Sequence, residues 1–242
     1  MTRPVILLTR PEASSRRMAA LWAARLGDRV GFCISPLMEI RLDPRLPDLS
    51  GIRTLIFTST NGVAAYVAAK GPDNLPCYTV GDATACAARK AGLRAISAGG
   101  NADALIQRIL QDGAPGPMLH LRGAYARGGI AERLSAQGCA VSQAVVYTQN
   151  ALPLTAEAQT VLEGETPVII PLFSPRSAAL LGSGPFAAPV HVIAISEAVA
   201  NSLRFAVEHC VVAAHPDFES MTLAIEALLN SAPWRSSQPG QE

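Results

Sequence analysis

The sequence predicts an α/β protein built from two similar lobes, each with a parallel β-sheet, that are related by internal duplication. Three observations predict this fold class. Short apolar runs alternate with segments of helical periodicity, one strand-to-helix motif occurs twice at matching spacings, and two extended segments interrupt the alternation. Those segments, near Pro36 and at residues 148–153, are expected to be two extended strands that join the lobes.

Strands and amphipathic helices alternate through the first half of the chain. Apolar runs typical of strands buried on both faces of a parallel sheet lie at residues 5–9, 30–35, 54–58, 77–80 and 94–97. Helices are expected between them, at Met18, Leu21, Trp22 and Leu26, at Val63, Tyr66 and Val67, at residues 82–91, and at Leu105, Ile106, Ile109 and Leu110. Asn101 is expected to cap the last of these helices, and glycines follow three of them: Gly27, Gly92 and Gly113.

The second half repeats this alternation. Strands are expected at residues 118–121, 140–147, 168–173, 190–195 and 210–214, of which residues 140–147 alternate between apolar and polar side chains. Helices are expected around Ile130 and Leu134, at residues 155–162, and at Met221, Ile225, Leu228 and Leu229. Residues 236–242 lack apolar side chains and should form a disordered tail.

The duplicated motif is an apolar run that ends in small hydroxyl residues at a helix start. It occurs at residues 55–63 and again at residues 170–178. From Ser59 to Gly81, in the next strand-to-helix turn, is 22 residues, and from Ser174 to Ser196 is also 22. The following strand ends lie 17 residues further on in both halves. We interpret this as two copies of one unit facing each other across a cleft; similar lengths of unrelated strand–helix units are the alternative.

Composition excludes several classes of protein. An apolar fraction of 49% with 16% charged residues over 242 residues is typical of a compact globular chain. A net charge of +1 gives no basic surface for nucleic acid or for an anionic membrane. Five scattered cysteines without a Cys-x-x-Cys pair predict mostly buried, reduced thiols and a cytoplasmic protein. The sequence contains no apolar run long enough for a membrane span, and no signal peptide is expected.

The chemistry that the residues themselves predict is anion binding. Ser59, Asn61 and Gly62 lie where a helix N-terminus offers backbone N–H groups to a ligand, beyond the carboxyl end of a strand. Walker, dinucleotide-binding and Gly-x-Ser-x-Gly motifs are absent. The four histidines lack acidic neighbours at ligand spacing, so they are interpreted as structural residues and no metal is expected.

A family resemblance adds to this interpretation. The segments that carry it are Leu8–Pro11, Phe57–Val63, Val80–Ala85, Leu121–Gly123 and Val145–Tyr147, in this order along nearly the whole chain. Together with the duplication, they resemble uroporphyrinogen-III synthase. The resemblance implies two α/β lobes with an active site in the cleft between them. It places residues 1–36 and 151–235 in a discontinuous first lobe and residues 37–150 in the second.

The resemblance also implies a reaction and a set of site residues. The family converts hydroxymethylbilane, a linear tetrapyrrole carrying acetate and propionate chains, to uroporphyrinogen III by loss of water and inversion of the terminal ring. It requires no cofactor. Tyr147 matches a tyrosine that assists departure of the hydroxyl. The substrate-binding candidates are Arg10, Thr58, Ser59, Asn61, Gly62, Gly81, Thr84, Ala85, Arg122, Gly123, Ser174, Ser177 and Ser196.

The second copy departs from the family pattern at one turn. Val199 stands where the family tends to have threonine, and Glu197 adds a carboxylate. The expected partner is the linear tetrapyrrole, handed over by the bilane-forming enzyme to a monomer. Two alternatives stay open: a two-lobed regulatory protein that binds a small anion without catalysis, and a sugar-nucleotide transferase of similar architecture.

Overall fold

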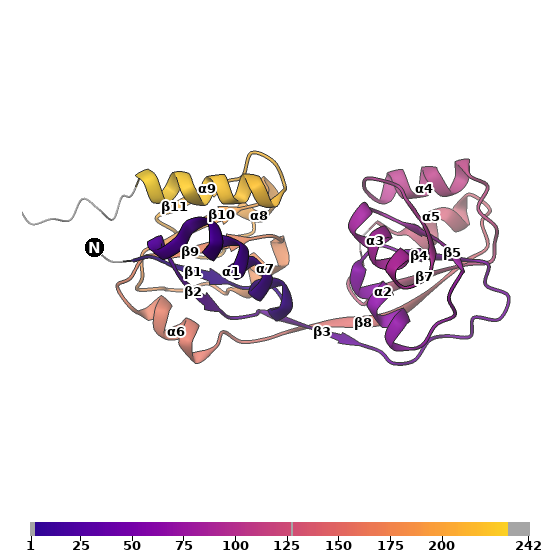
Figure 1. The fold of residues 1–242 in the computed structure, drawn as a ribbon, viewed down its shortest axis with the longest axis horizontal. Helices are drawn as coiled ribbons and strands as arrows, with labels where there is room; N and C mark the ends of the chain where they lie inside the picture. Colours follow the sequence, from indigo (N-terminus) through magenta and orange to yellow (C-terminus); the bar gives the residue numbers. More distant parts are fainter. Residues whose placement is uncertain (1–2, 127, 232–242) are drawn as a thin grey trace, which may run out of the picture. The chain divides into compact units, whose positions relative to one another are not determined.

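The computed structural model describes residues 3–126 and 128–231, which form two compact units (Figure 1). Unit 1 contains the described residues up to Glu39 and from Ala151 onward, and unit 2 is Ile40–Asn150. The first division thus falls between Glu39 and Ile40, whereas the sequence placed it between Pro36 and Leu37. The expected tail at residues 236–242 lies outside the described residues.

Unit 1 has a parallel five-stranded sheet in the order β11-β10-β9-β1-β2. Its strands are β1 (Val5–Leu8), β2 (Gly31–Ile34), β9 (Val168–Leu172), β10 (Val190–Ala194) and β11 (His209–Val212). One face is covered by α1 (Glu12–Leu26), which continues into the 3₁₀ turn η1 (Gly27–Arg29), and by α9 (Phe218–Ser231). The other face packs against α6 (Ala156–Glu163), α7 (Pro175–Leu180) and α8 (Glu197–Ala200).

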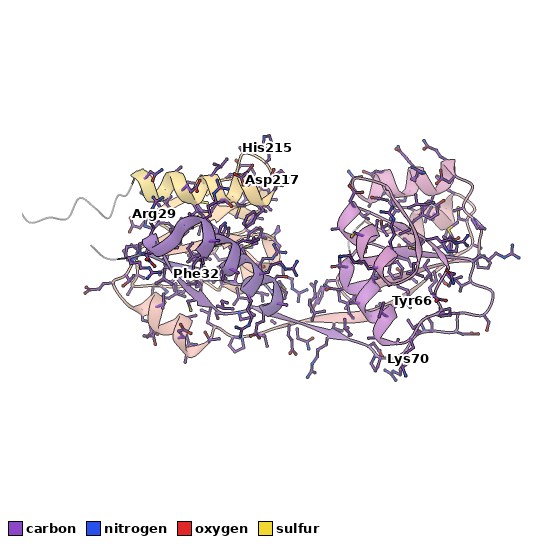
Figure 2. All side chains as sticks on the ribbon, viewed as in Figure 1. Arg29, Phe32, Tyr66, Lys70, His215 and Asp217 are labelled. Carbon is purple, nitrogen blue, oxygen red and sulfur yellow. The ribbon has the colours of Figure 1, made fainter. Side chains whose placement is uncertain are left out.

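Contacts between α1 and α9 join the beginning of unit 1 to its end. The indole N–H of Trp22 donates to Thr222 Oγ1 at 2.9 Å, and its ring stacks on Phe218. At the end of the same helix pair, Arg29, which Figure 2 labels, donates to Asn230 Oδ1 at 2.7 Å. Because Trp22 has no exposed surface, these contacts fix distant parts of the sequence in one core.

Unit 2 has a six-stranded sheet in the order β3-β8-β7-β4-β5-β6. Its strands are β3 (Met38–Leu42), β4 (Thr54–Phe57), β5 (Pro76–Thr79), β6 (Arg94–Ser97), β7 (Met118–Gly123) and β8 (Val141–Ala151). Helices α2 (Thr60–Ala68) and α3 (Asp82–Lys90) cover one face, and α4 (Ala102–Gln111) and α5 (Ile130–Ala136) cover the other. The hydroxyl of Tyr66, a residue of α2 that Figure 2 labels, donates to the Pro72 carbonyl at 2.6 Å and closes the turn after that helix.

The strand registers support the duplication that the spacings predicted. In unit 2 the paired row Leu55–Cys77–Ala95 crosses β4, β5 and β6. In unit 1 the row Ile170–Val192–Cys210 crosses β9, β10 and β11, and each of its residues lies 115 positions after its counterpart. The next strands agree as well, because β1 lies beside β9 as β7 lies beside β4. The two sheets therefore share strand order over five strands and the register of these rows, and unit 2 has β3 in addition.

Several local expectations were wrong. Leu21, Val67 and Leu110 were placed on inward helix faces, but their side chains are 51%, 51% and 39% exposed. These helices bury narrower stripes, so one residue at the margin of each stripe remains in solvent. All five cysteines are free thiols, but Cys86 and Cys210 are exposed and not buried.

The expected alternation of residues 140–147 also fails, because Val146 and Tyr147 are both buried. Its cause is a β-bulge. Arg122 pairs with Val145 but Gly123 pairs with Tyr147, which leaves Val146 as an extra residue on β8. A bulge of this kind breaks the two-residue period of a strand, so both side chains enter the core against α2 and α3.

Candidate active site

In unit 2 the predicted site residues gather at one edge of the sheet. Strands β7, β4 and β5 are neighbours and parallel, so the turns after them lie side by side. This is the edge at which parallel sheets bind ligands. The turn after β4 and the start of α2 carry Thr58, Ser59, Asn61 and Gly62. The turn after β5 and the start of α3 carry Gly81, Thr84 and Ala85, and the end of β7 carries Arg122 and Gly123.

Ser59 and Gly62 have structural reasons for their positions. Ser59 is the N-cap of α2, where its hydroxyl accepts from the Asn61 backbone N–H at 3.1 Å. A β-carbon on Gly62 would lie 3.0 Å from the Leu121 carbonyl oxygen. The absence of a side chain therefore brings α2 close to β7. Asn61 and Thr58 remain half-buried at the sheet edge.

The turn after β5 is more open. Nothing lies within 4 Å of a β-carbon placed on Gly81, so this turn has room for a ligand. The Thr84 side chain is 7% exposed, and its hydroxyl makes no hydrogen bond within the described residues. Ala85 has no exposed surface and packs in the core, so only its backbone is available to this site.

Tyr147 is positioned by the bulge and by a glycine. Its ring occupies the space beside Gly123, where an added β-carbon would lie 2.5 Å from Tyr147 Cζ and 2.8 Å from its hydroxyl oxygen. The Tyr147 side chain is 6% exposed, and its hydroxyl makes no hydrogen bond within the described residues. The residue lines a pocket of about 310 Å³. A phenol hydroxyl without a protein partner can donate to a ligand.

The Tyr147 pocket also contains two arginines that sequence reasoning missed. Opposite the β8 residues, the pocket is lined by the segment Arg41–Arg45. The Asp43 backbone N–H donates to the Val146 carbonyl at 2.8 Å, which holds this segment against β8. Arg45 pairs with Asp43, and its guanidinium lowers the pKa of that carboxyl group. The only signal in the sequence was the run of alternating charges beside an extended segment. The pocket thus combines a phenol with guanidinium groups suited to carboxylates.

Arg122, by contrast, is occupied by its own unit. Its guanidinium donates to Gln143 Oε1 at 2.8 Å and to the carbonyls of Gly123 and Ala124 at 2.9 and 3.3 Å. Gln143 in turn donates to Glu132. These contacts hold the end of β7 together, and they leave Arg122 fewer donors for a ligand than a free guanidinium has.

Unit 1 places its predicted residues at the matching edge of its own sheet. Arg10 follows β1 and lies over the Phe173 ring, 4.6 Å from its centroid. Ser174 caps α7 by accepting from the Ser177 N–H at 3.0 Å, and the two hydroxyls are 2.9 Å apart. Ser196 precedes α8 without a side-chain cap.

The histidines are structural where they are buried. His120, on β7, is 2% exposed, and neither of its ring nitrogens has a hydrogen-bond partner within the described residues. Burial, with repulsion from Arg122, lowers the pKa of His120 to about 4. His191 is buried and stacks on His209, whereas His209 and His215 are exposed. Among the described residues, no cluster of three His, Cys, Asp or Glu side chains could hold a metal ion.

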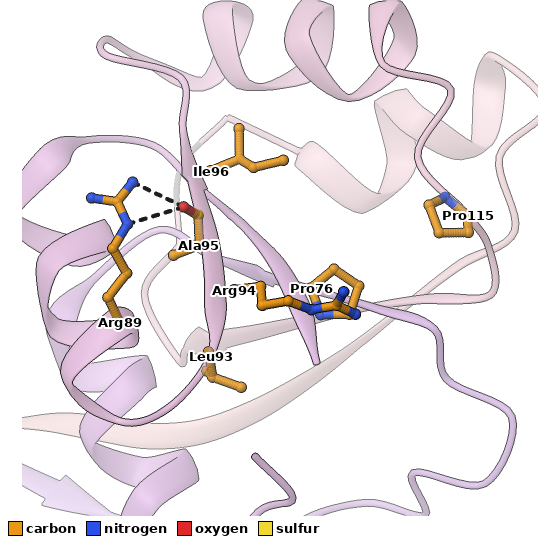
Figure 3. Close-up of a pocket in the computed structure, with 7 residues that line it drawn as sticks. All are labelled: Pro76, Arg89, Leu93, Arg94, Ala95, Ile96 and Pro115. Atoms are coloured by element: carbon orange, nitrogen blue, oxygen red, sulfur yellow. Dashed lines mark hydrogen bonds between the residues drawn. The ribbon is translucent and has the colours of Figure 1, made fainter. Parts of the chain in front are cut away.

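A larger hollow, of about 590 Å³, lies at the free edge of unit 2 beside β6 (Figure 3). Arg89 donates two hydrogen bonds to the Ala95 carbonyl, at 2.9 and 3.2 Å (Figure 3). Arg94 donates to the Asn74 carbonyl at 2.9 Å. Both arginines are thus used to cover or brace an edge strand, a structural role that protects it from pairing with another chain.

The fold and these residues define a two-unit α/β protein with candidate anion-binding groups at the carboxyl ends of both sheets. A family model described as uroporphyrinogen-III synthase HemD matches residues 32–222, which is most of the chain. The chain therefore belongs to the uroporphyrinogen-III synthase family. It is a lyase-type enzyme of tetrapyrrole biosynthesis that acts on a small-molecule substrate.

Solved structures show the same fold. Uroporphyrinogen-III synthetase from Helicobacter pylori is 20% identical, with a TM-score of 0.68 over 93% of this chain and 99% of that chain. A mutant uroporphyrinogen III synthase from Thermus thermophilus is 15% identical, with a TM-score of 0.52 over 94% of this chain and 99% of that one. A search of curated proteins gave no match. No helix within residues 3–126 and 128–231 is long and apolar enough to cross a membrane.

Proposed function

We propose that the protein cyclises hydroxymethylbilane to uroporphyrinogen III with inversion of the terminal pyrrole ring. The observation that carries this proposal is Tyr147, which lines a pocket together with Arg41 and Arg45 and whose hydroxyl has no hydrogen-bond partner within the described residues. An O–H donor of this kind can protonate a departing hydroxyl group, and guanidinium groups can hold the acetate and propionate chains around it.

The reaction then needs little further chemistry from the protein. The terminal C–O bond breaks as the Tyr147 proton passes to the oxygen, which leaves as water, while the pyrrole nitrogen lone pair stabilises the resulting azafulvene cation. The substituted carbon of the last pyrrole attacks this cation and forms a spiro intermediate. Fragmentation and closure at the other carbon invert the ring. The tyrosinate regains a proton when the closed ring loses one.

Shape and anion binding account for the inversion. The substrate is flexible, and direct closure without inversion competes with the rearrangement, so the protein must favour one folded geometry. We assign carboxylate binding to the turns after β4 and β5 in unit 2 and to Arg10, Ser174 and Ser177 in unit 1. Helix N-termini and hydroxyl groups bind carboxylates without a high net charge, which agrees with the net charge of +1.

The test is incubation with enzymatically prepared hydroxymethylbilane, followed by separation of the porphyrin isomers after oxidation. Type III product above the uncatalysed background is expected, and type I alone would reject the proposal.

Exhaustive dialysis against EDTA should leave the rate unchanged, because we propose a reaction without a metal or organic cofactor. Loss of activity that an added metal restores would reject that part. We further propose that the active species is a monomer, supplied by the bilane-forming enzyme; sedimentation of the protein during turnover tests its size.

A further inference from the structure

A small pocket at the beginning of α1 contains two arginines. It has a volume of about 110 Å³ and is lined by Arg10, Ser14, Arg17, Met18 and Leu21. Arg10 lies just beyond the carboxyl end of β1, at the ligand-binding edge of the unit 1 sheet. The Arg10 carbonyl accepts from Ser15 Oγ at 2.8 Å, which fixes the backbone of this residue against the helix.

The contact of Arg10 with Phe173 leaves its hydrogen-bond donors available. Its guanidinium carbon lies over the Phe173 ring, and this cation–π contact needs no hydrogen bond. The N–H groups lie in the guanidinium plane, and within the described residues they donate to no carboxylate or carbonyl. A half-buried guanidinium held in this way presents a planar fork, which matches the two oxygens of a carboxylate.

Arg17 adds a second positive charge to the same pocket. Burial lowers the pKa of Arg10, and the charge of Arg17 lowers it further. The nearest acidic residue in sequence, Glu12, pairs with Arg16 one turn along the helix and not with Arg17. Two like charges that share a pocket repel each other, and an anion between them turns that repulsion into attraction.

We propose that Arg10 and Arg17 form a subsite for one carboxylate group of the substrate, with Ser14 at its rim. Arg17 is thereby a substrate-binding residue, a role that no sequence pattern indicated. The subsite rests on the proposed function for the identity of its ligand. Inorganic phosphate presents the same anionic oxygens, so the experiment must separate the two sources.

The probe is uroporphyrin III, the stable oxidised form of the proposed product, which carries eight carboxylates. Its dissociation constant is measured by fluorescence titration for the full-length wild type and for Arg17→Gln, Arg10→Gln and the double variant. Arg16→Gln is the matched control, because Arg16 is adjacent on α1, is exposed and does not line the pocket. Removing one charged hydrogen-bond donor should weaken binding by about tenfold.

Arg17→Gln is expected to bind uroporphyrin about tenfold more weakly and to raise the KM for hydroxymethylbilane with kcat within threefold, while Arg16→Gln changes both less than twofold. The double variant should lose little more than Arg10→Gln alone, because one carboxylate is bound by both residues. Equal losses in Arg16→Gln and Arg17→Gln would show a general charge effect and overturn the proposal. Unchanged binding in Arg17→Gln would also overturn it.

Two further results separate the ligand and the function. If inorganic phosphate shifts the Arg17 side-chain N–H resonance while uroporphyrin affinity does not depend on Arg17, the pocket binds phosphate and the substrate subsite is rejected. If the wild type binds uroporphyrin through Arg17 but makes no type III product, the proposed function fails and the subsite stands. If the wild type makes type III product and Arg17→Gln is unaffected, the function stands and the subsite is rejected.

Discussion

Arg10 and Arg122 occupy equivalent positions in the two units but have different surroundings. In unit 2 Met118 on β7 pairs with Thr54, and in unit 1 Ile6 on β1 pairs with Ile169, which lies 115 residues after Thr54. Met118 and Ile6 are therefore equivalent, and Arg122 and Arg10 each lie four residues beyond them. Arg122 donates to a glutamine and to two carbonyls, whereas the Arg10 guanidinium lies over the Phe173 ring. Phe173 itself lies 115 residues after Thr58, so an aromatic platform in unit 1 stands where unit 2 has a threonine.

The turns after β5 and β10 differ in a similar way. Helix α3 has nine residues and carries Thr84 at the sheet edge, whereas α8 has four and carries the buried Val199 at the equivalent position. The duplicated units thus keep the same sheet and diverge where their strands end. Because sheet packing depends on the interior and ligand binding on these turns, one unit can specialise for the reacting group and the other for holding the substrate.

The largest expected effect concerns which segments fold on their own. Residues 37–150 contain all six strands of unit 2, apart from Ala151 at the end of β8. This segment should therefore unfold cooperatively when expressed alone. Residues 1–115 should not fold, because they lack β9 beside β1 and β7 beside β4. Urea unfolding followed by circular dichroism checks both. A folded 1–115 segment and an unfolded 37–150 segment would mean that the sequence halves are the domains.

Replacing Tyr147 should have the largest effect on catalysis. Proton donors typically contribute about 10²–10⁴ in rate, and the pyrrole nitrogen already helps to expel the hydroxyl group, so the low end applies. Tyr147→Phe should lose roughly 100-fold in kcat with a much smaller change in KM, and its product should remain type III. Single-turnover kinetics with isomer analysis measures both quantities.

Tyr78→Phe is the control for that variant, because the Tyr78 hydroxyl donates to Asp112 and its ring packs on the other face of the sheet. It should keep its kcat. If Tyr147→Phe also kept a near-wild-type kcat, the residue would have no part in the mechanism. A product shifted toward type I would instead mean that Tyr147 positions the substrate.

His120 should make the stability of unit 2 depend on pH. Its counterpart in unit 1 is the buried Leu8. The two correspond because His120 lies two residues after Met118, and Leu8 lies two residues after the equivalent Ile6. Its folded pKa is about 4, and an unfolded histidine titrates near 6.5. As pH falls from 6.5 to 4, the unfolded chain binds the proton first, so stability is lost. Between pH 7 and 5 the loss is roughly 2 kcal/mol.

His120→Leu, which introduces the residue of the other unit, should remove this part of the pH dependence. The free energy of unfolding is measured with urea at pH 5, 6 and 7. His215→Leu serves as the control for replacing a histidine by leucine elsewhere in the chain, because His215 is an exposed histidine of unit 1. An equally steep loss of stability in wild type and in His120→Leu would exclude His120 as the source.

Gly123→Ala should slow the same step as Tyr147→Phe, because it displaces the Tyr147 ring. The new β-carbon would lie 2.5 Å from the tyrosine ring, so the ring must move. We expect about a tenfold loss in kcat, and a much smaller further loss when the change is made in Tyr147→Phe. Gly31→Ala, on strand β2 of unit 1, is the control because its β-carbon would make only an ordinary contact at 3.6 Å. Fully additive losses would show that Gly123 acts independently of the tyrosine.

Local features of the fold and site could be predicted from the sequence, and features that depend on distant partners could not. The caps by Ser59, Ser174 and Asn101 follow from interactions within a few residues. The bulge at Val146 depends on how β8 pairs with β7, and no local pattern encodes it. The contact of Arg10 with Phe173 joins two strand ends that are far apart in the chain, so neither that contact nor the role proposed for Arg17 could be anticipated.

The smallest expected effect tests the difference between the two turns. Thr84→Val gives unit 2 the residue that unit 1 has at Val199, and its shape preserves the packing of a side chain that is 7% exposed. One hydrogen bond to a substrate carboxylate is worth about 1 kcal/mol, so KM should rise about fivefold with kcat nearly unchanged. Thr160→Val, on the exposed part of α6, is the control and should leave both constants unchanged.

The reverse change, Val199→Thr, should not improve binding, because Val199 is 1% exposed and its new hydroxyl would be buried in a core of apolar side chains. It should instead lower the free energy of unfolding by about 1–3 kcal/mol. If Val199→Thr lowered KM, the turn after β10 would bind substrate as its counterpart does, and the two units would not have diverged in this role.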